Sequence, residues 1–198
     1  MGISASGLEV EVKLSLSTRE EAVGRLEGLH VALESERHFE DNEIYDTPDG
    51  VLSREGRLLR LRVAAGEVLV TYKEKVHTEL RAKVRREVQT VVGSAEAMRE
   101  IFSRLGLVRI YRYQKYRTYY GWIDPETGER LAIALDDTPI GTFIELEGPK
   151  ESIDRAARQM GCKEDDYVLE DYRTLHSAWL EQRGLPPGDL VFAAGSSA

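Results

Sequence analysis

Cysteine, long apolar runs and leader-like segments are almost absent from this chain of 198 residues. Its single cysteine, Cys162, excludes an intrachain disulfide, and a buried or incidental thiol is the simplest role for it. No stretch approaches the ~18 consecutive apolar residues of a membrane span. Residues 1–7 lack a basic region followed by an apolar run, so no signal peptide is expected. These absences predict a cytoplasmic protein without a membrane segment.

An excess of positive charge is also missing, since 27 lysines and arginines stand against 35 aspartates and glutamates. The net charge of −8 argues against a protein that binds nucleic acid through an overall basic surface, but it allows a local basic pocket. Tyrosines interleave with bases between Tyr111 and Tyr120, as in some single-stranded nucleic-acid binders. Strand propensity and packing explain that stretch better, so nucleic acid is not an expected partner.

Several common catalytic motifs are absent as well. The chain has no P-loop, no dinucleotide-binding glycine motif and no G-x-S-x-G nucleophile turn. Its four histidines are scattered, and no cysteine–histidine cluster has the spacing of zinc ligands. The chemistry of this protein is therefore expected to depend on its carboxylates and bases.

What the chain does contain is a recurring pattern of charged residues two positions apart. Successive side chains of a strand point to opposite faces, so such residues share a face. In the clearest stretches the alternate positions are apolar, as Val10 and Val12 are in the first one. Six strands with charge repeated along one face predict a sheet that curls around a charged interior. The six groups are Glu9/Glu11/Lys13, Arg60/Arg62, Lys73/Lys75, Lys83/Arg85/Glu87, Lys115/Arg117 and Glu145/Glu147.

The predicted fold is α+β, with about eight strands and four helices in one domain. Most strands follow one another directly, so the sheet should be antiparallel, and eight strands can close into a barrel with flanking helices. The domain is expected to span residues 1–183, and the Pro-, Gly- and Ser-rich residues 184–198 to form a disordered tail. The expected helices cover residues 18–29, 94–105, 152–161 and 166–183. Two separate tyrosine-rich strands are expected at 108–113 and 114–122.

The paired acids predict a site for a hard divalent cation, which prefers oxygen ligands. Without a cation, like charges about 4 Å apart repel by roughly 4 kcal/mol at an effective dielectric of ~20. Asp136 shares its strand face with two alanines, which leaves space for a ligand beside it. Each acidic pair alone also fits a solvated strand face, but together they favour Mg²⁺ or Mn²⁺. The expected ligands are Glu9, Glu11, Asp136, Glu145 and Glu147.

The bases of the same strands predict a site for several consecutive phosphates. Arginine binds phosphate oxygens through two parallel hydrogen bonds, and lysine acts as a compact point charge. The alternative for any single pair is an exposed base beside an acidic neighbour. Eight bases on one side of the sheet are too many for a lone carboxylate substrate. The expected substrate-binding residues are Lys13, Arg60, Arg62, Lys73, Lys83, Arg85, Lys115 and Arg117.

From about Leu8 to Leu180 these motifs, in this order, resemble the CYTH family, also called triphosphate tunnel metalloenzymes. Each motif is short, and the order over ~140 residues makes the resemblance specific. One departure is the Thr71–Lys75 stretch, which differs from the Tyr-Lys-Gly-Pro of the cyclase-like branch. The motifs are E-x-E-x-K at Glu9, Tyr45-Asp-Thr, R-x-R at Arg60, Thr71-Tyr-Lys, K-x-R-x-E at Lys83, K-x-R at Lys115, Asp136 and G-x-F-x-E-x-E at Gly141.

The resemblance implies a barrel open as a tunnel, a divalent metal and a bound triphosphate. Family members include inorganic, thiamine and RNA triphosphatases and class IV adenylate cyclases. Near the C-terminus, Arg173 lies in a stretch that resembles the closing helix of the cyclase-like branch. The positions that match phosphate contacts are Arg62, Lys73, Arg85, Lys115 and Arg117, and those that match metal ligands are Glu9, Glu11, Glu145 and Glu147.

The first hypothesis is a metal-dependent hydrolase of inorganic tripolyphosphate or of an organic or nucleoside triphosphate. The bases would stabilise the charge of the transition state, and Glu87 or Asp136 would orient the attacking water. Lys13, which lies next to the acids, is grouped with these catalytic residues.

Three alternatives remain open at this stage. A class IV adenylate cyclase would use the same tunnel to make cyclic AMP and pyrophosphate from ATP. A non-catalytic polyphosphate-binding module would need the bases alone, and its converging acids would then oppose the anion. A plain barrel with structural ion pairs would gain little stability from them, because desolvation offsets the attraction. Whether the C-terminal helix and tail form a homodimer is also open.

Overall fold

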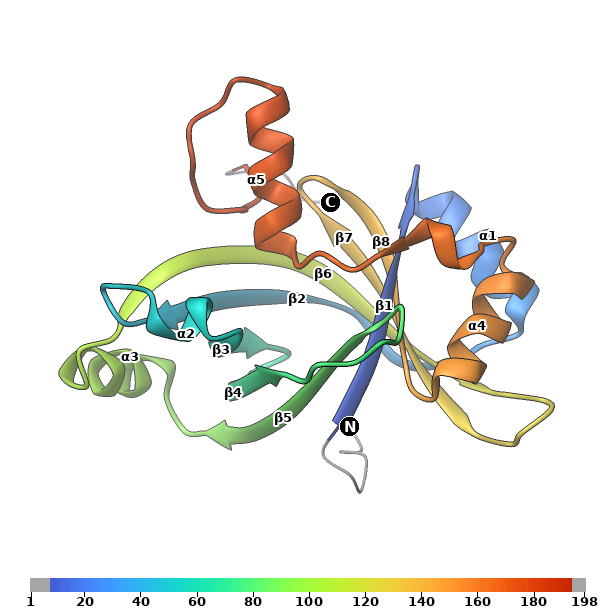
Figure 1. Ribbon diagram of the computed structural model, residues 1–198, viewed down its shortest axis with the longest axis horizontal. Helices are drawn as coiled ribbons and strands as arrows, with labels where there is room; N and C mark the ends of the chain where they lie inside the picture. Colours follow the sequence, from blue (N-terminus) through green and yellow to red (C-terminus); the bar gives the residue numbers. More distant parts are fainter. Residues whose placement is uncertain (1–7, 194–198) are drawn as a thin grey trace.

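A computed structural model describes residues 8–193 of the chain, and nine strands account for nearly half of these residues. Eight of the strands follow the order β1-β5-β4-β3-β2-β6-β7-β8, and the sheet closes because β5 and β8 both pair with β1 (Figure 1). All of these pairings are antiparallel, so the predicted barrel is confirmed. The strands are β1 Leu8–Leu16, β2 Ala32–Asp46, β3 Arg57–Ala64, β4 Glu67–Lys75, β5 Lys83–Val92, β6 Val108–Ile123, β7 Arg130–Thr138, β8 Gly141–Glu147 and β9 Tyr167–Val168.

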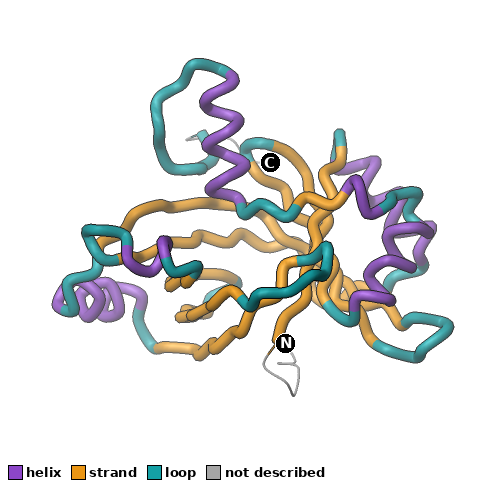
Figure 2. The backbone as a smooth tube through the Cα atoms, viewed as in Figure 1, coloured by secondary structure: helices purple, strands orange, loops and turns teal. Residues whose placement is uncertain are grey.

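Within the described residues, five α-helices flank the barrel (Figure 2). Polar side chains begin three of them by accepting a hydrogen bond from a first-turn backbone N–H: Thr18, Ser94 and Asp171. None of the helices within residues 8–193 has the length and apolarity needed to cross a membrane. The helices are α1 Arg19–Leu29, α2 Val51–Arg54, α3 Ala95–Arg104, α4 Lys150–Gln159 and α5 Tyr172–Gln182, and a 3₁₀ turn spans Glu164–Asp166.

The main hydrophobic core lies outside the barrel rather than within it. The apolar faces of β1, β7 and β8 point outward and pack against α1 and α4, which lie side by side on that flank (Figure 1). Leu14, Ile133 and Leu146 are buried there against Leu26 of α1 and Ile153 of α4. A smaller cluster around Phe102 seats α3 on β3 and β2. Because the apolar residues are buried outside, the inward face is left to charged side chains.

Two of the predicted elements differ from the structure. The tyrosine-rich residues 108–123 form one continuous strand, β6, because β2 runs alongside almost its whole length. The helix expected at 166–183 starts only at Tyr172, after the short strand β9 has paired with Lys13 and Leu14 of β1. Tertiary pairing therefore overrides the local pattern in both places.

The C-terminal residues leave α5 and return to the barrel. Residues 189–192 contact the β6 edge, and Leu190 is buried there. The expected disorder of residues 184–198 thus does not describe this attached segment. Residues 194–198 lie outside the described residues, as do residues 1–7 at the other end.

Candidate functional site

The strand registers bring all the predicted site residues to the inner face of the barrel. Residues that lie opposite each other on paired strands share a face. Around the barrel the opposite pairs include Glu11 with Lys83, Lys73 with Glu87, and Arg117 with Asp136. The pairings of Lys115 with Glu40 and of Glu11 with Glu147 complete the circuit. The alternation read from the sequence therefore produces one continuous charged interior.

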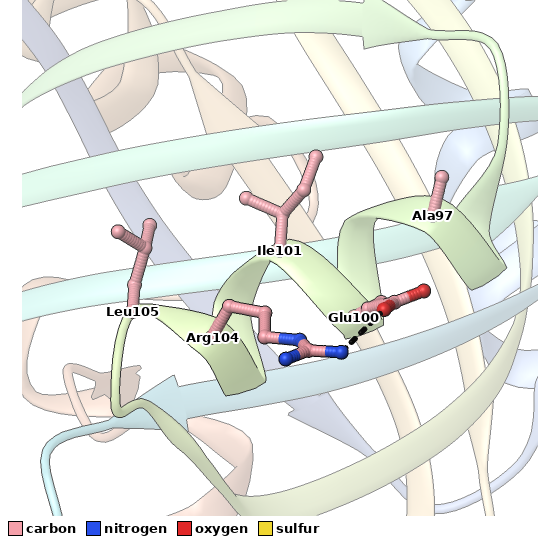
Figure 3. A pocket seen from close by; sticks show the side chains of 5 residues that line it. All are labelled: Ala97, Glu100, Ile101, Arg104 and Leu105. Carbon is pink, nitrogen blue, oxygen red and sulfur yellow. Dashed lines mark hydrogen bonds and ion pairs between the residues drawn. The ribbon is translucent and has the colours of Figure 1, made fainter.

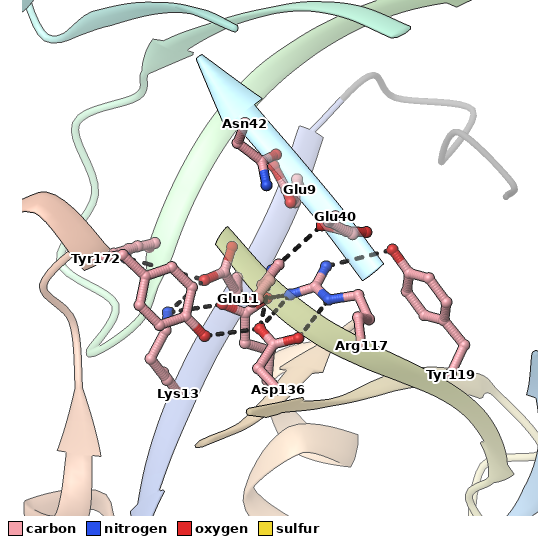
Figure 4. Close-up of polar contacts among 12 residues, drawn as sticks. Glu9, Glu11, Lys13, Glu40, Asn42, Arg117, Tyr119, Asp136 and Tyr172 are labelled. Carbon is pink, nitrogen blue, oxygen red and sulfur yellow. Dashed lines mark hydrogen bonds and ion pairs between the residues drawn. The ribbon is translucent and has the colours of Figure 1, made fainter. Parts of the chain in front are cut away.

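The side chain of Lys13 lies between Glu11 of β1 and Glu145 of β8, two of the expected metal ligands. Its buried ammonium lies 3.2 Å from Glu11 and 3.0 Å from Glu145 (Figure 4). Burial alone would raise the pKa of Glu11, but Lys13 and Lys83 outweigh it and hold that pKa at about 2. Burial likewise opposes ionisation of Glu145, but Arg117 and Lys13 keep its pKa well below the usual range. Both carboxylates are therefore charged at neutral pH.

Lys73 lies in the same way between two other carboxylates of the interior. It lies 2.6 Å from Glu9 and 2.7 Å from Glu87. Burial raises the pKa of Glu9 to about 7 against the pull of Lys73, and Glu11 and Glu87 add to the increase. Burial and the same two neighbours also raise the pKa of Glu147, whose side chain makes no hydrogen bond or ion pair with residues 8–193. These carboxylates repel one another and lack sufficient positive charge.

Asp136 occupies a different position from the other predicted metal ligands. Its carboxylate accepts hydrogen bonds from Lys115 at 2.9 Å, from Arg117 at 2.5 and 2.6 Å, and from the Tyr172 hydroxyl at 2.6 Å (Figure 4). Arg117 also bonds Glu145. Asp136 therefore anchors two of the predicted phosphate-binding bases. Arg173, which the resemblance suggested, is exposed and follows the buried Tyr172 in the chain.

Two buried polar residues of β2 were missed in the sequence analysis. Glu40 lies 3.2 Å from Arg62, and Asn42 accepts a hydrogen bond from the same guanidinium at 2.9 Å. Burial opposes ionisation of Glu40, but Arg62 and Lys115 hold its pKa well below the usual range. His38, Glu40 and Asn42 alternate along the strand, so the signal used for the other six strands was present here too.

Arg60 is a buried base without an acidic partner. Only 8% of the residue is exposed, and its guanidinium contacts the hydroxyls of Thr71 at 3.2 Å and Tyr113 at 3.4 Å. Its Nε makes no hydrogen bond, and no carboxylate among residues 8–193 forms an ion pair with it. An uncompensated buried charge is costly, so this position favours an anionic ligand.

The last two predicted bases lie at β5. Lys83 donates to the backbone carbonyl of Glu170 at 2.8 Å and lies 3.9 Å from Glu11. Burial lowers the pKa of Lys83 to about 8, and Lys13 and Arg85 contribute to the decrease. Arg85 forms no ion pair within the described part of the chain. Arg60 and Arg85 are thus the predicted bases that form no ion pair with a carboxylate of residues 8–193.

The acids offer oxygen donors of the kind that Mg²⁺ and Mn²⁺ prefer. Within residues 8–193, no three acidic, histidine or cysteine side chains stand together at metal-binding spacing. The reason is visible in the ion pairs, since Lys73 separates Glu9 from Glu87 and Lys13 separates Glu11 from Glu145. Burial, with repulsion from Glu11 and Glu87, raises the pKa of Glu9 despite Lys73, so a cation among these carboxylates would relieve charge that Lys73 alone does not match.

Open hollows in the surface lie away from this interior. One of about 360 Å³ runs along α3 between Ala97, Ile101 and Leu105, with Glu100 and Arg104 beside it (Figure 3). Another of about 390 Å³ lies between Trp122 and Gln159. None of the interior acids or bases lines either hollow. Most acids and bases of the interior form ion pairs with one another, so an anion that binds the paired bases must separate them from their acids.

A model of the CYTH domain matches residues 7–170 of the chain. This match covers the whole barrel and every residue of the charged interior except Tyr172. The chain belongs to the CYTH family. A Methanocaldococcus jannaschii relative, named as a candidate adenylate cyclase, is 26% identical over 191 residues, which cover 90% of this chain and 99% of the relative.

CYTH-type barrels among solved structures resemble this one. A Vibrio parahaemolyticus protein described as a candidate adenylate cyclase superposes with a TM-score of 0.68 at 20% identity, covering 86% of this chain and 98% of that one. A Hippeastrum protein described as a candidate adenylyl cyclase with a dominant triphosphatase activity has a TM-score of 0.54 at 16% identity, covering 96% and 92%. At these identities the likeness establishes the fold alone.

Proposed function

We propose that the protein hydrolyses a triphosphate bound in the charged interior, with the help of a divalent metal ion. The observation that carries this proposal is the buried guanidinium of Arg60, which forms no ion pair with any carboxylate in the described part of the chain. Arg62 and Lys115 lie near it around the Tyr113 hydroxyl, and together they lower the pKa of Tyr113 despite its burial. A chain of phosphates supplies the negative charge that this part of the interior lacks.

The side chains of the interior have distinct parts in this reaction. Arg60, Arg62 and Lys115 hold the phosphate chain, and Arg117 neutralises the charge that spreads over the transferred group. Lys13 keeps Glu11 and Glu145 ionised. The carboxylate of Glu87, which is not among the proposed metal ligands, orients the attacking water. Asp136 acts by fixing the bases around it, since its oxygens already accept hydrogen bonds from Lys115, Arg117 and Tyr172.

A Mg²⁺ or Mn²⁺ ion would be held by Glu9, Glu11, Glu145 and Glu147. When bound, it supplies positive charge to phosphate oxygens and lowers the pKa of a coordinated water. The unpaired, electrostatically strained Glu147 and the raised pKa of Glu9 support this assignment. Lys73 is then free to leave its two glutamates and to bind phosphate.

The deciding experiment incubates the protein with Mg²⁺ or Mn²⁺ and with tripolyphosphate, ATP or thiamine triphosphate in turn. Orthophosphate, pyrophosphate and cyclic AMP are measured in the same samples. Release of orthophosphate from any of the three supports the hydrolase and identifies its preferred substrate. Binding that needs no metal and gives no product would contradict it and favour a polyphosphate-binding module.

The Glu147→Gln variant tests the metal site. We expect turnover to fall at least a hundredfold while the melting temperature stays within a few degrees, because the Glu147 side chain makes no hydrogen bond or ion pair with residues 8–193. The matched control is Glu74→Gln on the outer face of β4, which should retain full activity. Equal losses of activity and stability in Glu147→Gln would argue against a metal ligand.

An adenylate cyclase is the second candidate, because the Methanocaldococcus jannaschii relative bears that name and matches along almost its entire length. The ribose 3′-oxygen would then attack the α-phosphate of ATP in the same interior. Cyclic AMP and pyrophosphate in place of orthophosphate would establish this reaction.

A further inference from the structure

The C-terminal segment Asp189–Phe192, here named the strap, is attached to the first half of β6. The backbone of Leu190 donates to the Arg112 carbonyl at 2.9 Å and accepts from the Gln114 N–H at 2.8 Å. The Asp189 carboxylate accepts from the backbone N–H of Arg112 at 2.8 Å and from the guanidinium of Arg109 at 2.8 Å. Backbone and side-chain bonds together therefore hold the strap in a defined register.

The strap covers an edge that the barrel leaves open. β7 pairs with β6 only from Tyr116 onward, so residues 108–115 of β6 have no strand neighbour on that side. Unpaired backbone groups on such an edge need partners when they are buried. The strap supplies them in parallel orientation, opposite Tyr113.

Leu190 connects the strap to the end of the charged interior. It is 2% exposed and belongs to a cluster that includes Tyr113, Phe143 and Tyr172. Tyr172 belongs to the first turn of α5, so the cluster fixes the place where this helix meets the barrel (Figure 1). Val191, the next residue along, is 37% exposed and lies outside the cluster.

Tyr172 in turn contacts three charged residues of the site. Its hydroxyl donates to Asp136 at 2.6 Å. The ammonium group of Lys13 lies 4.9 Å from the centre of its ring (Figure 4). That of Lys115 lies 5.2 Å from the same point. A shift of this ring therefore moves an acid and two bases together.

We propose that Leu190 is a positioning residue, through which the strap fixes Tyr172 on Asp136 and so sets the geometry of Lys13 and Lys115. Its consequence for turnover rests on the proposed function, whereas its hold on α5 does not. The apolar side chain of Leu190 fills the outer side of the cluster, and the hydrogen bonds of Asp189 fix its depth. Within the strap it is Leu190 that reaches the site, from beyond the matched family domain, which ends at residue 170.

The test compares Leu190→Asp with Val191→Asp, which introduces the same charge one residue further along on the exposed side. We expect Leu190→Asp to lower kcat/KM for the preferred triphosphate by about tenfold at a temperature where both proteins are folded. Val191→Asp should stay within twofold of the wild type. Leu190→Met, which conserves the volume of the side chain, should keep the activity of the wild type. If Leu190→Asp fails to fold, Leu190→Ala replaces it in both measurements.

A second readout follows α5 without any substrate. Trypsin cleavage at the exposed Arg173 requires α5 to open, so its rate, followed by mass spectrometry, should rise in Leu190→Asp and not in Val191→Asp. If the wild type hydrolyses no triphosphate, the proposed function fails. The cleavage rates alone then decide whether Leu190 holds α5 in place. Unchanged cleavage, or a lower melting temperature with an unchanged kcat/KM, would overturn the proposal.

Discussion

Two arginines on the same face of β3 differ in whether an acid matches their charge. Arg62 is paired with Glu40, and Arg60 contacts only neutral hydroxyls. We predict that Arg60→Met leaves the free energy of unfolding unchanged or raises it, because an uncompensated buried charge is removed. The same variant should weaken tripolyphosphate binding at least tenfold in calorimetric titrations.

The control is Arg62→Met, which leaves the buried Glu40 carboxylate without its guanidinium partner. Breaking a buried pair in this way costs roughly 3 kcal/mol, so this variant should be clearly less stable in urea unfolding. If Arg60→Met were as destabilising as Arg62→Met, the interior around Arg60 would be structural rather than a ligand site.

Glu40 determines a further prediction, on the dependence of stability on pH. Arg62 and Lys115 outweigh its burial and lower its pKa in the folded state far below the value of 4.5 expected in the unfolded chain. A depressed carboxyl pKa stabilises the fold above the unfolded pKa, and this contribution is lost as pH falls below about 4.5. Glu40→Gln should therefore lower stability at pH 7 and flatten its decline between pH 5 and 3, as measured by urea unfolding at each pH.

The exposed Glu36, four residues earlier on β2, provides the matched control for this prediction. Glu36→Gln should follow the wild-type pH profile. An unchanged acid limb in Glu40→Gln would mean that other carboxylates dominate the acid sensitivity of the barrel.

At the scale of elements, helix α5 depends on its first residues. The Asp171 side chain accepts hydrogen bonds from the backbone N–H of Thr174 and from its hydroxyl, both at 2.9 Å. Asp171→Ala should lower the free energy of unfolding by about 1 kcal/mol, because the N-cap is lost. Since Tyr172 follows directly, kcat should fall as well, as a steady-state assay would show.

Asp171→Ser keeps a capping oxygen and should retain both stability and activity. If Asp171→Ala and Asp171→Ser lose activity equally, the charge of Asp171 near Lys83 would be the important feature instead of the cap. Burial raises the pKa of Asp171, but its hydrogen bonds to Thr174 and the charge of Lys83 outweigh burial and lower it.

The strand and helix pattern was predictable to different degrees. Bounds of β1 follow from its strict alternation, because one face packs on α1 and α4 and the other faces the interior. That β6 is one continuous strand was not predictable, because only its pairing with β2 extends the strand beyond residue 113. For the same reason β9 was hidden, because two residues form a strand only beside β1.

For the whole molecule, the interior predicts coupling between metal and anion. Acids and bases neutralise each other there, so a metal alone displaces Lys73 and an anion alone displaces Glu40 or Asp136. We predict that Mg²⁺ and tripolyphosphate together raise the melting temperature by more than the sum of their separate effects. Ligand at a hundred times its Kd adds about 2.7 kcal/mol to the free energy of unfolding.

A matrix of Mg²⁺ and tripolyphosphate concentrations in thermal-shift experiments measures this coupling. Addition of a chelator should remove the metal-dependent part, and Ca²⁺ or sulfate at equal ionic strength controls for general salt effects. Purely additive shifts would contradict the exchange of partners that the ion pairs imply.

The sequence by itself determined the closed barrel, the inward charges and the membership in a family of such barrels. It did so because a period of two fixes which side chains share a face, whatever the partner strand is. Only the tertiary structure decided how those charges are paired: that Arg60 lacks an acid, that Glu40 and Tyr172 belong to the site, and that the strap reaches it. These depend on contacts between residues such as Asp136 and Tyr172, which are far apart in the chain and are brought together only by the packing of α5 and the strap against β6.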